Sequence, residues 1–531
     1  MKRLISLLTA AALAAALAGC SSADSSSSAP SETASVTSAE TAAQSSAVTA
    51  ATDVPAVSSE QDHQPLKPLP ELVSPFPADT EALEQTETPM PEFEKVAAQY
   101  EEGKDSLDKK IESFSSKKDH PCINITTQDK KKILSKDEYV ASVIDVFNCG
   151  EEFRLTAEAG VKVRGNSTAD QGDEKPYRIK FSEKHNMLGL HGGAEYKSWV
   201  LLRSYWNLAP DYMGFSLAKE IFGGKYYSSD YMYVNLYING YPRGVYLLCE
   251  QNQAAKGRIE VNEPKKDETQ AEIGYLVEMD NYPSEEHPYF YYDHLAADIT
   301  DISGKKRQFI EHAYSVRSDI STKGQLAFIE NYVTGCFRIL YAAVIDGRSL
   351  MFDENGKLVS GEGYFKDPFD AVCAVIDIES LANMLILEEL VHNNDVGAGS
   401  FYMAVDFSEG SKYKKLTFLA PWDFNWAYEG DANGGYYAST FQKLHTDGWD
   451  RSNPWFILAM KSEAFTEAVK AKWAELTNSK VLTKTTAKVV GDCETLRKDL
   501  GNNDAWKIDQ AKNIAQFVSG RIKWLNSVWT K

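Results

Sequence analysis

After about residue 121, the hydrophobic and polar positions of the chain alternate with the two-residue period of β-strands. Asn239-Gly240 separates two of these runs, and an Asn-Gly pair readily adopts the positive φ angles of a tight hairpin turn. Short connections of this kind favour antiparallel neighbours over alternating βαβ units. We predict strands over Cys122–Thr127, Tyr139–Asn148, Val161–Gly165, Tyr177–Phe181, Met232–Gly240 and Gly244–Glu250.

The pattern becomes helical after about Gln308. Asp377 can cap a helix that runs from Ile378 to about Asn393, and this helix is apolar on most sides, so we expect it to be buried. The predicted fold class is therefore α+β, with an antiparallel sheet first and a mostly helical part after it. The tail from residue 454 to 531 predicts two or three amphipathic helices with Trp473, Trp506, Trp524 and Trp529 on their apolar faces.

The N-terminus has the pattern of a secretory signal peptide. Lys2 and Arg3 precede an apolar run from Leu4 to Leu17, and the small residues before Cys20 complete the sequence LAGC of a bacterial lipobox. We predict that residues 1–19 are removed and that Cys20 is lipid-modified, which makes the protein an extracytoplasmic lipoprotein of the cell envelope with the membrane as a partner. The alternative is an uncleaved anchor followed by a chance cysteine.

Residues 20–91 predict a disordered tether. Between Ser21 and about Asp62 the chain contains no Lys, Arg or aromatic residue, and a Pro-rich stretch follows from Pro65 to Pro91. Such sequence cannot bury enough apolar area to offset the entropy lost on ordering. Residues 92–120 predict a charged helical lead-in, which either docks on the globular part or extends the tether. We assign residues 121–531 to a single domain.

Composition and charge exclude several classes of function. The 531 residues are 43% hydrophobic and 25% charged, as in folded proteins. The 56 basic and 76 acidic residues give a net charge of −20, which argues against nucleic acid as a partner. Apart from Cys20 there are six cysteines, widely spaced and without a CxxC pair, so a structural zinc site is not expected. Six thiols in a large exported domain are compatible with either disulfides or buried cysteines.

A local basic segment stands out against this acidic background. Residues 161–203 contain eight basic and five acidic side chains. Strand alternation over Tyr177–Phe181 places Arg178 and Lys180 on the face opposite to the apolar side chains. The preceding turn can aim backbone N–H groups and hydroxyls at a phosphate, so the segment predicts an anion held over a sheet. The alternative is a plain hairpin with a solvated basic face. The turn consists of Arg164, Gly165, Asn166, Ser167 and Thr168.

Two aspartates provide the second candidate feature. Asp395 falls at the end of the predicted buried helix, and Asp423 lies just after a predicted strand over Leu416–Ala420, with a further short strand at Ser400–Val405. Acids at the ends of adjacent elements can converge on one divalent cation and one nucleophile. The alternative is that Asp395 caps the helix end and Asp423 hydrogen-bonds its own turn.

The motifs RGNST, KPYRIKF, YINGYPRGVYLLCE, GYLVEMD and PWDFNWAYEG occur in this order, and together they resemble the CotH (spore coat protein H) family of atypical secreted protein kinases. The resemblance implies a protein-kinase-like fold with an antiparallel N-lobe and a mostly helical C-lobe. It also implies ATP with Mg²⁺ or Mn²⁺ as cofactors, and phosphorylation of Ser or Thr in exported or surface proteins. Asp395 then matches the catalytic aspartate and Asp423 the metal-binding aspartate, while the turn at Arg164–Thr168 takes the place of the phosphate-covering loop.

Other assignments from the resemblance leave alternatives open. Lys180 is our choice for the lysine that contacts the α- and β-phosphates, with Arg178 and Lys175 as competitors. Glu250 or Glu278 would orient that lysine through an ion pair. The chain departs from the typical kinase pattern at two positions: Ser400 stands where the catalytic loop usually supplies an Asn metal ligand, and Asn425 stands where many family members have Asp.

Two other functions compete with the kinase. A catalytically inactive surface lipoprotein could use the same fold to bind a protein or a glycan, and the 27 Tyr and 10 Trp residues suit stacking on sugars. A glycoside hydrolase could use Asp395 and Asp423 as its carboxylate pair. The basic residues of the first motif count against the hydrolase, because a neutral sugar needs no cationic binding site.

Overall fold

The computed structural model describes residues 63, 65–70, 79–84, 88–114, 120–170, 172, 174–203, 207–265, 268–280, 282–283, 287–294, 298–309, 311–443, 450–504 and 508–530. The predicted signal peptide (1–19), the lipidation site Cys20, most of the predicted tether and Trp506 lie outside the described residues. The predictions made for them stay predictions.

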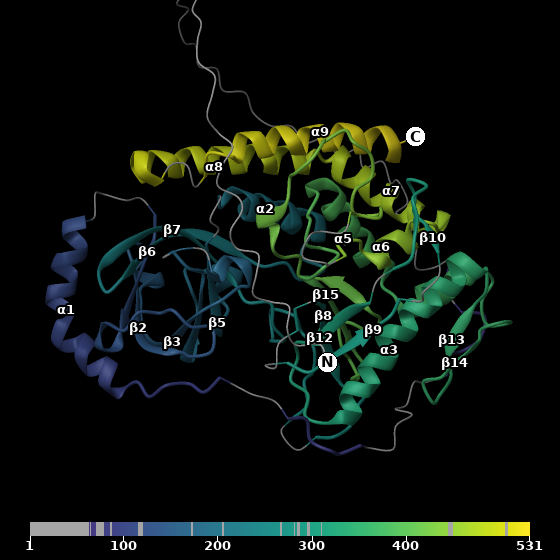
Figure 1. Ribbon diagram of the computed structural model, residues 1–531, viewed down its shortest axis with the longest axis horizontal. Coiled ribbons are helices and arrows are strands. Elements are labelled where there is room, and N and C mark those ends of the chain that lie inside the picture. The colour runs from purple at the N-terminus through teal and green to yellow at the C-terminus, as the bar shows by residue number, and fades with distance from the viewer. Residues whose placement is uncertain are drawn as a thin grey trace, which may run out of the picture. The chain divides into compact units, whose positions relative to one another are not determined.

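The first part of the domain is a seven-stranded barrel (Figure 1). The order around the barrel is β1-β2-β3-β4-β5-β7-β6, and all neighbours are antiparallel except β1 and β6, whose parallel pairing (Cys122 opposite Asn235) closes it. Asn239 and Gly240 form the β6–β7 turn with φ angles of 52° and 74°, which confirms the hairpin prediction. The strands are β1 (Cys122–Thr127), β2 (Val140–Phe147), β3 (Leu155–Val163), β4 (Tyr177–His185), β5 (Tyr196–Leu202), β6 (Tyr231–Ile238) and β7 (Tyr241–Glu250).

The helical lead-in docks on this barrel. Helix α1 (Glu94–Phe114) buries Val96 and Tyr100 against β2, and the Tyr100 hydroxyl donates a hydrogen bond of 2.5 Å to Asp145. Some described residues of the predicted tether (20–91) also contact the domain. The N–H of Leu66 donates a hydrogen bond to the carbonyl of Tyr364, and the N–H of Leu83 donates one to the carbonyl of Ser321.

The second part of the domain combines a sheet with helices. Its five strands are ordered β16-β15-β8-β12-β9, with antiparallel neighbours throughout. The short strands predicted at Ser400–Val405 and Leu416–Ala420 are found as β15 and β16, whereas β8, β9 and β12 were not predicted. The residues of β8 and β12 are all buried, so they do not show the alternation of a half-exposed strand. The strands are β8 (Gly274–Met279), β9 (Tyr289–Tyr292), β12 (His312–Val316), β15 (Phe401–Asp406) and β16 (Thr417–Leu419).

The predicted buried helix is confirmed as α5 (Ile378–Val391). The Asp377 side chain caps it by accepting a 3.0 Å hydrogen bond from the backbone N–H of Ser380. The other helices of this part are α2 (Ala209–Phe222), α3 (Lys323–Tyr341), α4 (Pro368–Val375), α6 (Pro454–Ala459), α7 (Glu463–Asn478), α8 (Val481–Asp504) and α9 (Ala511–Trp529). The remaining short strands are β10 (Ile299–Thr300), β11 (Lys306–Arg307), β13 (Leu350–Phe352) and β14 (Leu358–Ser360).

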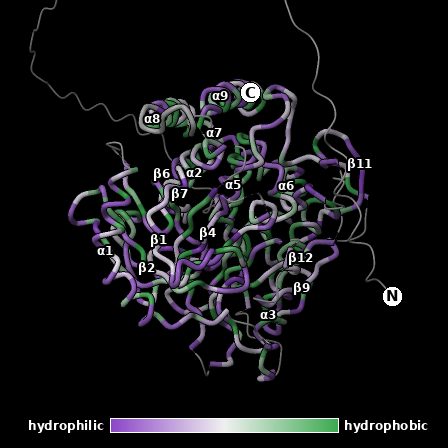
Figure 2. Tube along the Cα trace, turned by 60° about the vertical axis from the view of Figure 1, so that its left-hand side comes forward, coloured by the Kyte–Doolittle hydropathy of each residue, from purple (hydrophilic) through white to green (hydrophobic). Residues whose placement is uncertain are grey.

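The described residues of the C-terminal tail form four helices, α6 to α9, where the sequence predicted two or three. Helices α8 and α9 lie side by side over α2 and α5 (Figure 1), and hydrophobic and hydrophilic residues alternate along them (Figure 2). Trp473 and Trp529 are buried, and Trp524 packs against the same core. The six cysteines among the described residues form no disulfide with one another.

Candidate active site

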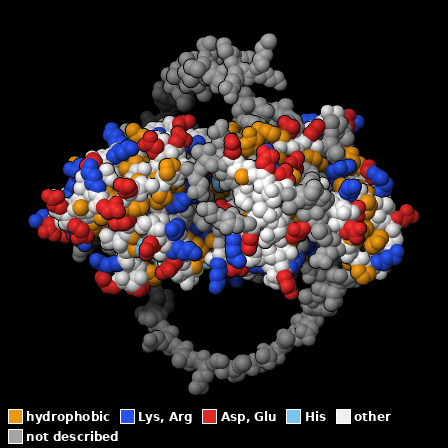
Figure 3. Space-filling model, turned by 90° about the horizontal axis from the view of Figure 1, so that it is seen from below, with side chains coloured by type: hydrophobic (Ala, Val, Ile, Leu, Met, Phe, Trp, Pro, Cys, Tyr) orange, Lys and Arg blue, Asp and Glu red, His pale blue; other side chains and the backbone are white. Residues whose placement is uncertain are grey.

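A cavity of about 2400 Å³ lies between the outer face of the barrel and the second part of the domain. The barrel contributes β3, β4 and β5, and the second part contributes the segments that follow α5 and β16. Seen from below, Lys and Arg side chains gather near the middle of the molecule (Figure 3). The lining brings together nine of the residues predicted from the sequence: Arg164, Asn166, Ser167, Thr168, Arg178, Lys180, Asp395, Ser400 and Asp423.

The cationic wall of the cavity follows from strand alternation. Val161 of β3 and Ile179 of β4 are opposite each other, and both are fully buried inside the barrel. Because side chains alternate along a strand, the neighbours of these two residues point to the outer face of the barrel. Arg178 pairs in register with Lys162, and Lys180 pairs with Gly160. The Arg178 Nε is buried and has no hydrogen-bond partner within the described part of the chain. A buried guanidinium donor without a partner is available to an anionic ligand.

The turn after β3 is held in shape by its own residues. Gly165 has a φ of 87°, and a Cβ there would lie 2.4 Å from the Thr168 hydroxyl, so any other residue would strain the backbone and displace this hydroxyl. The N–H of Ala169 donates to the carbonyl of Asn166. The Lys175 ammonium donates a 2.5 Å hydrogen bond to the Ala169 carbonyl and does not line the cavity. Lys175 therefore braces the turn, which leaves Arg178 and Lys180 as the candidates for phosphate contacts.

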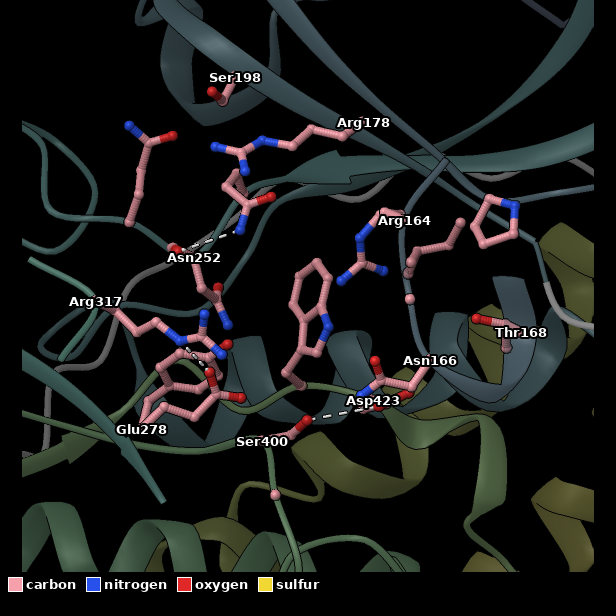
Figure 4. A pocket seen from close by; sticks show the side chains of 18 of the residues that line it. Arg164, Asn166, Thr168, Arg178, Ser198, Asn252, Glu278, Arg317, Ser400 and Asp423 are labelled. Carbon is pink, nitrogen blue, oxygen red and sulfur yellow. Dashed lines mark hydrogen bonds and ion pairs between the residues drawn. The ribbon is translucent and has the colours of Figure 1, made fainter. Parts of the chain in front are cut away.

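Asp423 faces this wall from below, and Arg164 and Arg178 reach toward the same space from above (Figure 4). Asp423 has the left-handed backbone conformation (φ 63°), which short polar residues tolerate, and begins a 3₁₀ turn over Phe424–Trp426. Burial raises the pKa of its carboxyl, while the charge of Arg164 and a hydrogen bond donated by the Ser400 hydroxyl (3.5 Å) lower it. A buried carboxylate in a cavity with a perturbed pKa is a candidate functional residue.

A third aspartate, Asp211, lies beside Asp423. It belongs to the first turn of α2, is almost fully buried, and accepts a 3.0 Å hydrogen bond from the backbone N–H of Phe424. Burial, together with the negative charge of Asp423, raises the pKa of Asp211 to about 8. Two buried acids that disfavour each other's ionisation are stabilised when a cation binds between them.

Asp395 lies in the loop that follows α5. The helix ends where His392 adopts the left-handed conformation (φ 51°), and the Asn393 side chain then accepts a 3.0 Å hydrogen bond from the N–H of Asp395. The Asp395 carbonyl accepts hydrogen bonds from Ala398 and Gly399, which closes the loop. The side chain of Asp395 does not cap α5: its Oδ1 forms a 2.5 Å ion pair with Arg451.

A family model described as CotH kinase protein matches residues 161–336 and 355–527. The chain belongs to the CotH kinase protein family. A comparison with curated proteins found no match. Membership implies a protein kinase that uses ATP. The matched CotH segments contain Arg164, Asp211, Asp395, Asp423 and Arg451, and so include both walls of the cavity.

Within this CotH domain, the two candidate glutamates have arginine partners. Glu250 is fully buried, forms 2.9 Å ion pairs with Arg258 and His191, and is not among the residues that line the cavity. The assignment of Glu250 to the nucleotide site is corrected accordingly: this side chain anchors the segment that leads out of the barrel. Glu278 does line the cavity, but it pairs with Arg317 at 2.6 Å, as Figure 4 also shows.

The sequence motifs of this CotH chain do not identify Asp211, Arg317 or Arg451 as site residues. Asp211 left a weak signal, since it is the only acid in the first ten residues of an otherwise apolar helix that begins with Ala209-Pro210. An acidic residue in the first turn is ordinary for a helix, so this signal does not distinguish a metal ligand from a capping charge. Arg451 carried no signal of this kind, because its partner lies far away in the sequence.

Proposed function

We propose that this CotH protein transfers the γ-phosphate of ATP to Ser or Thr hydroxyl groups of exported or surface proteins. The observation that carries the proposal is the shared cavity: a wall of arginine and lysine side chains faces Asp423 and Asp211, and Asp395 lies on the same lining. Phosphoryl transfer needs mainly positioning and charge neutralisation from a protein, and this cavity provides groups for both.

The barrel side of the cavity suits the phosphates. Arg164, Arg178 and Lys180 would neutralise the negative charge of the triphosphate, and the turn at 165–168 would contribute backbone N–H groups and the hydroxyls of Ser167 and Thr168. The resulting basic wall supports a polyanionic ligand in a protein whose net charge is strongly negative.

Asp423, Asp211 and the Ser400 hydroxyl would hold a divalent cation, Mg²⁺ or Mn²⁺. Their oxygen atoms are the ligand type that such ions prefer, and the mutual repulsion of the two buried carboxylates supports the fit. The bound ion would neutralise charge on the phosphate oxygens. Ser400 at this position is a neutral ligand, so we expect the affinity for the ion to depend mainly on the two aspartates.

Asp395 would orient the acceptor. Its carboxylate would accept the hydrogen bond of the incoming hydroxyl and take up its proton as the new O–P bond forms. The proposed location follows from the lipobox: with a lipid on Cys20, the domain works at the outer side of the membrane, where exported proteins pass. The acceptor is then a protein of the same compartment.

The test uses residues 20–531 with Cys20→Ser, labelled ATP, Mg²⁺ or Mn²⁺ and a mixture of exported proteins. We expect label on Ser or Thr, and no label with Asp395→Asn or Asp423→Asn. Asp395→Asn should retain the rise in melting temperature caused by metal and ATP, whereas Asp423→Asn should lose it. The proposal is wrong if Asp395→Asn labels acceptors at the parent rate. A parent protein that neither labels acceptors nor responds to ATP would instead support the inactive binding lipoprotein.

A further inference from the structure

Arg451 is the direct partner of the proposed acceptor-binding carboxylate. Its Nη1 lies 2.5 Å from Asp395 Oδ1, its side chain is 5% exposed, and it lines the same cavity as Asp395 and Asp423. The contact joins the loop after α5 to a segment 56 residues later in the chain. Neither the sequence motifs nor the family match assigns a role to this arginine.

The segment that carries Arg451 is fastened directly onto the loop that carries Asp395. Asn453 donates a 3.0 Å hydrogen bond to the carbonyl of Val396. Gly397 lies so close that a Cβ there would come within 2.1 Å of the Arg451 carbonyl oxygen. Asp450 forms an ion pair with Arg307 on the other side of the segment. Arg451 therefore has a fixed position relative to Asp395.

The guanidinium plane of Arg451 also packs against the turn that follows Asp423. Its central carbon lies 4.7 Å from the ring centroid of Trp426, at the end of the 3₁₀ turn that begins immediately after Asp423. Arginine stacks well on aromatic faces, and stacking restricts the directions in which its N–H groups point. The guanidinium of Arg451 thus contacts both the loop of Asp395 and the turn that follows Asp423.

We propose that Arg451 is a catalytic residue that binds the phosphoryl group during its transfer, and this proposal rests on the kinase function proposed above. In the transfer, the bond between the acceptor oxygen and phosphorus forms while the bond to the β-phosphate oxygen breaks. ADP leaves with the electron pair of the broken bond, the hydroxyl proton goes to Asp395, and Arg451 keeps its proton throughout.

The position of Arg451 matches the place where charge must be neutralised. The acceptor hydroxyl lies between Asp395 and the phosphorus atom, so a guanidinium within hydrogen-bonding distance of Asp395 is adjacent to the equatorial oxygens of the phosphoryl group. Arginine has five N–H donors, and the buried Nε of Arg451 has no hydrogen-bond partner among the described residues. The bond from Arg451 Nη1 to Asp395 Oδ1 also fixes the orientation of the carboxylate that would accept the hydroxyl proton.

The test compares Arg451→Met, Arg451→Lys and Arg451→Ala with the parent in the labelling assay, with kcat and KM determined for ATP and for the acceptor. Loss of a charge-stabilising arginine lowers kcat by about 10²-fold or more, so we expect this for Arg451→Met, with KM for ATP changed less than about threefold. Arg451→Lys should recover part of kcat. Free guanidinium should restore activity to Arg451→Ala, because the cavity left by the side chain admits it.

Arg307→Met is the matched control. It loosens the same segment by removing the partner of Asp450, but it keeps the guanidinium of Arg451. We expect a lower melting temperature, a much smaller loss of kcat and no response to guanidinium. The proposal is overturned if Arg451→Met keeps kcat within about threefold of the parent, or if it loses ATP binding and thermal stability together with activity and guanidinium restores nothing. If the parent itself transfers no phosphate, the kinase function fails instead, and this inference fails with it.

Discussion

The carboxylates of Asp211 and Asp423 share one buried environment, although they come from the first turn of α2 and from the turn after β16. The charge of Asp423 helps to raise the pKa of Asp211 to about 8, and the N–H that follows Asp423 donates to the Asp211 carboxylate. At neutral pH and without a cation, Asp211 is therefore mostly protonated. If a cation binds at this pair, as proposed above, its binding would release a proton and would depend on pH.

The first prediction concerns metal affinity. A cation that binds Asp211 must displace its proton, so we expect the affinity for Mg²⁺ or Mn²⁺ to rise by up to about tenfold per pH unit as pH increases toward 8, and to level off above it. Isothermal titration in buffers of different ionisation enthalpy should detect about one proton released per ion. Asp211→Asn should abolish this release. An affinity that does not change between pH 6 and 8 would contradict the assignment of Asp211 as a ligand.

The second prediction concerns the stability of the metal-free protein. The folded-state pKa of Asp211 is raised above the ordinary value of 3.8, so the folded state binds more protons than the unfolded state between about pH 4 and 8. Its contribution to the free energy of unfolding therefore falls as pH rises, on the order of 1 kcal/mol per pH unit. Asp211→Asn should melt at a higher temperature than the parent at pH 8.5 without metal, and at a similar temperature near pH 4. A lower melting temperature of the variant at pH 8.5 would contradict this.

The third prediction uses the contact between α2 and the Asp423 turn. A Cβ at Gly214 would lie 2.2 Å from the ring of Phe424, which is fully buried. Gly214→Ala should displace Phe424, weaken the bond between its N–H and Asp211, and lower both metal affinity and the free energy of unfolding, the latter by about 1–3 kcal/mol. Urea unfolding and metal titration measure the two effects.

Gly103→Ala is the control for that substitution. Gly103 lies within α1, and nothing comes within 4 Å of a Cβ placed there. Because alanine favours a helix over glycine, this variant should be more stable by roughly 0.5–1 kcal/mol with unchanged metal affinity. If both glycine variants bind metal as the parent does, the proposed link between Phe424 and the metal site is wrong.

The fourth prediction concerns the N-terminal segment between residues 79 and 91. Leu83 donates to the Ser321 carbonyl, the N–H of Lys323 donates to Glu81, and the Lys162 ammonium of β3 donates 3.1 Å to the Thr88 hydroxyl. The segment therefore binds both the barrel and the start of α3. A chain that begins at residue 92 should melt several degrees lower in calorimetry, whereas one that begins at residue 58 should melt as the parent does. Equal melting temperatures for all three would show that the segment adds no stability.

Much of the local structure could be predicted from the sequence, because backbone sterics and short-range hydrogen bonds determine it. The two-residue period placed Arg178 and Lys180 on the outward face of β4. The pair Asn239-Gly240 predicted its turn, and Asp377 predicted the start of α5. The motifs that resemble the CotH family placed Asp395 and Asp423, and the family match supports that resemblance.

Other features depended on packing between distant parts of the chain. Glu250 ends a strand whether it faces a nucleotide or, as here, Arg258, and only the tertiary contact distinguishes the two. The parallel pairing of β1 with β6 and the fully buried strands β8 and β12 have no local signature for the same reason. By itself the sequence determined which side chains each strand and helix presents. The tertiary structure alone decided that Asp211 would meet Asp423 and that Arg451 would meet Asp395, because such encounters follow from how buried surfaces fit together and not from the spacing of residues along the chain.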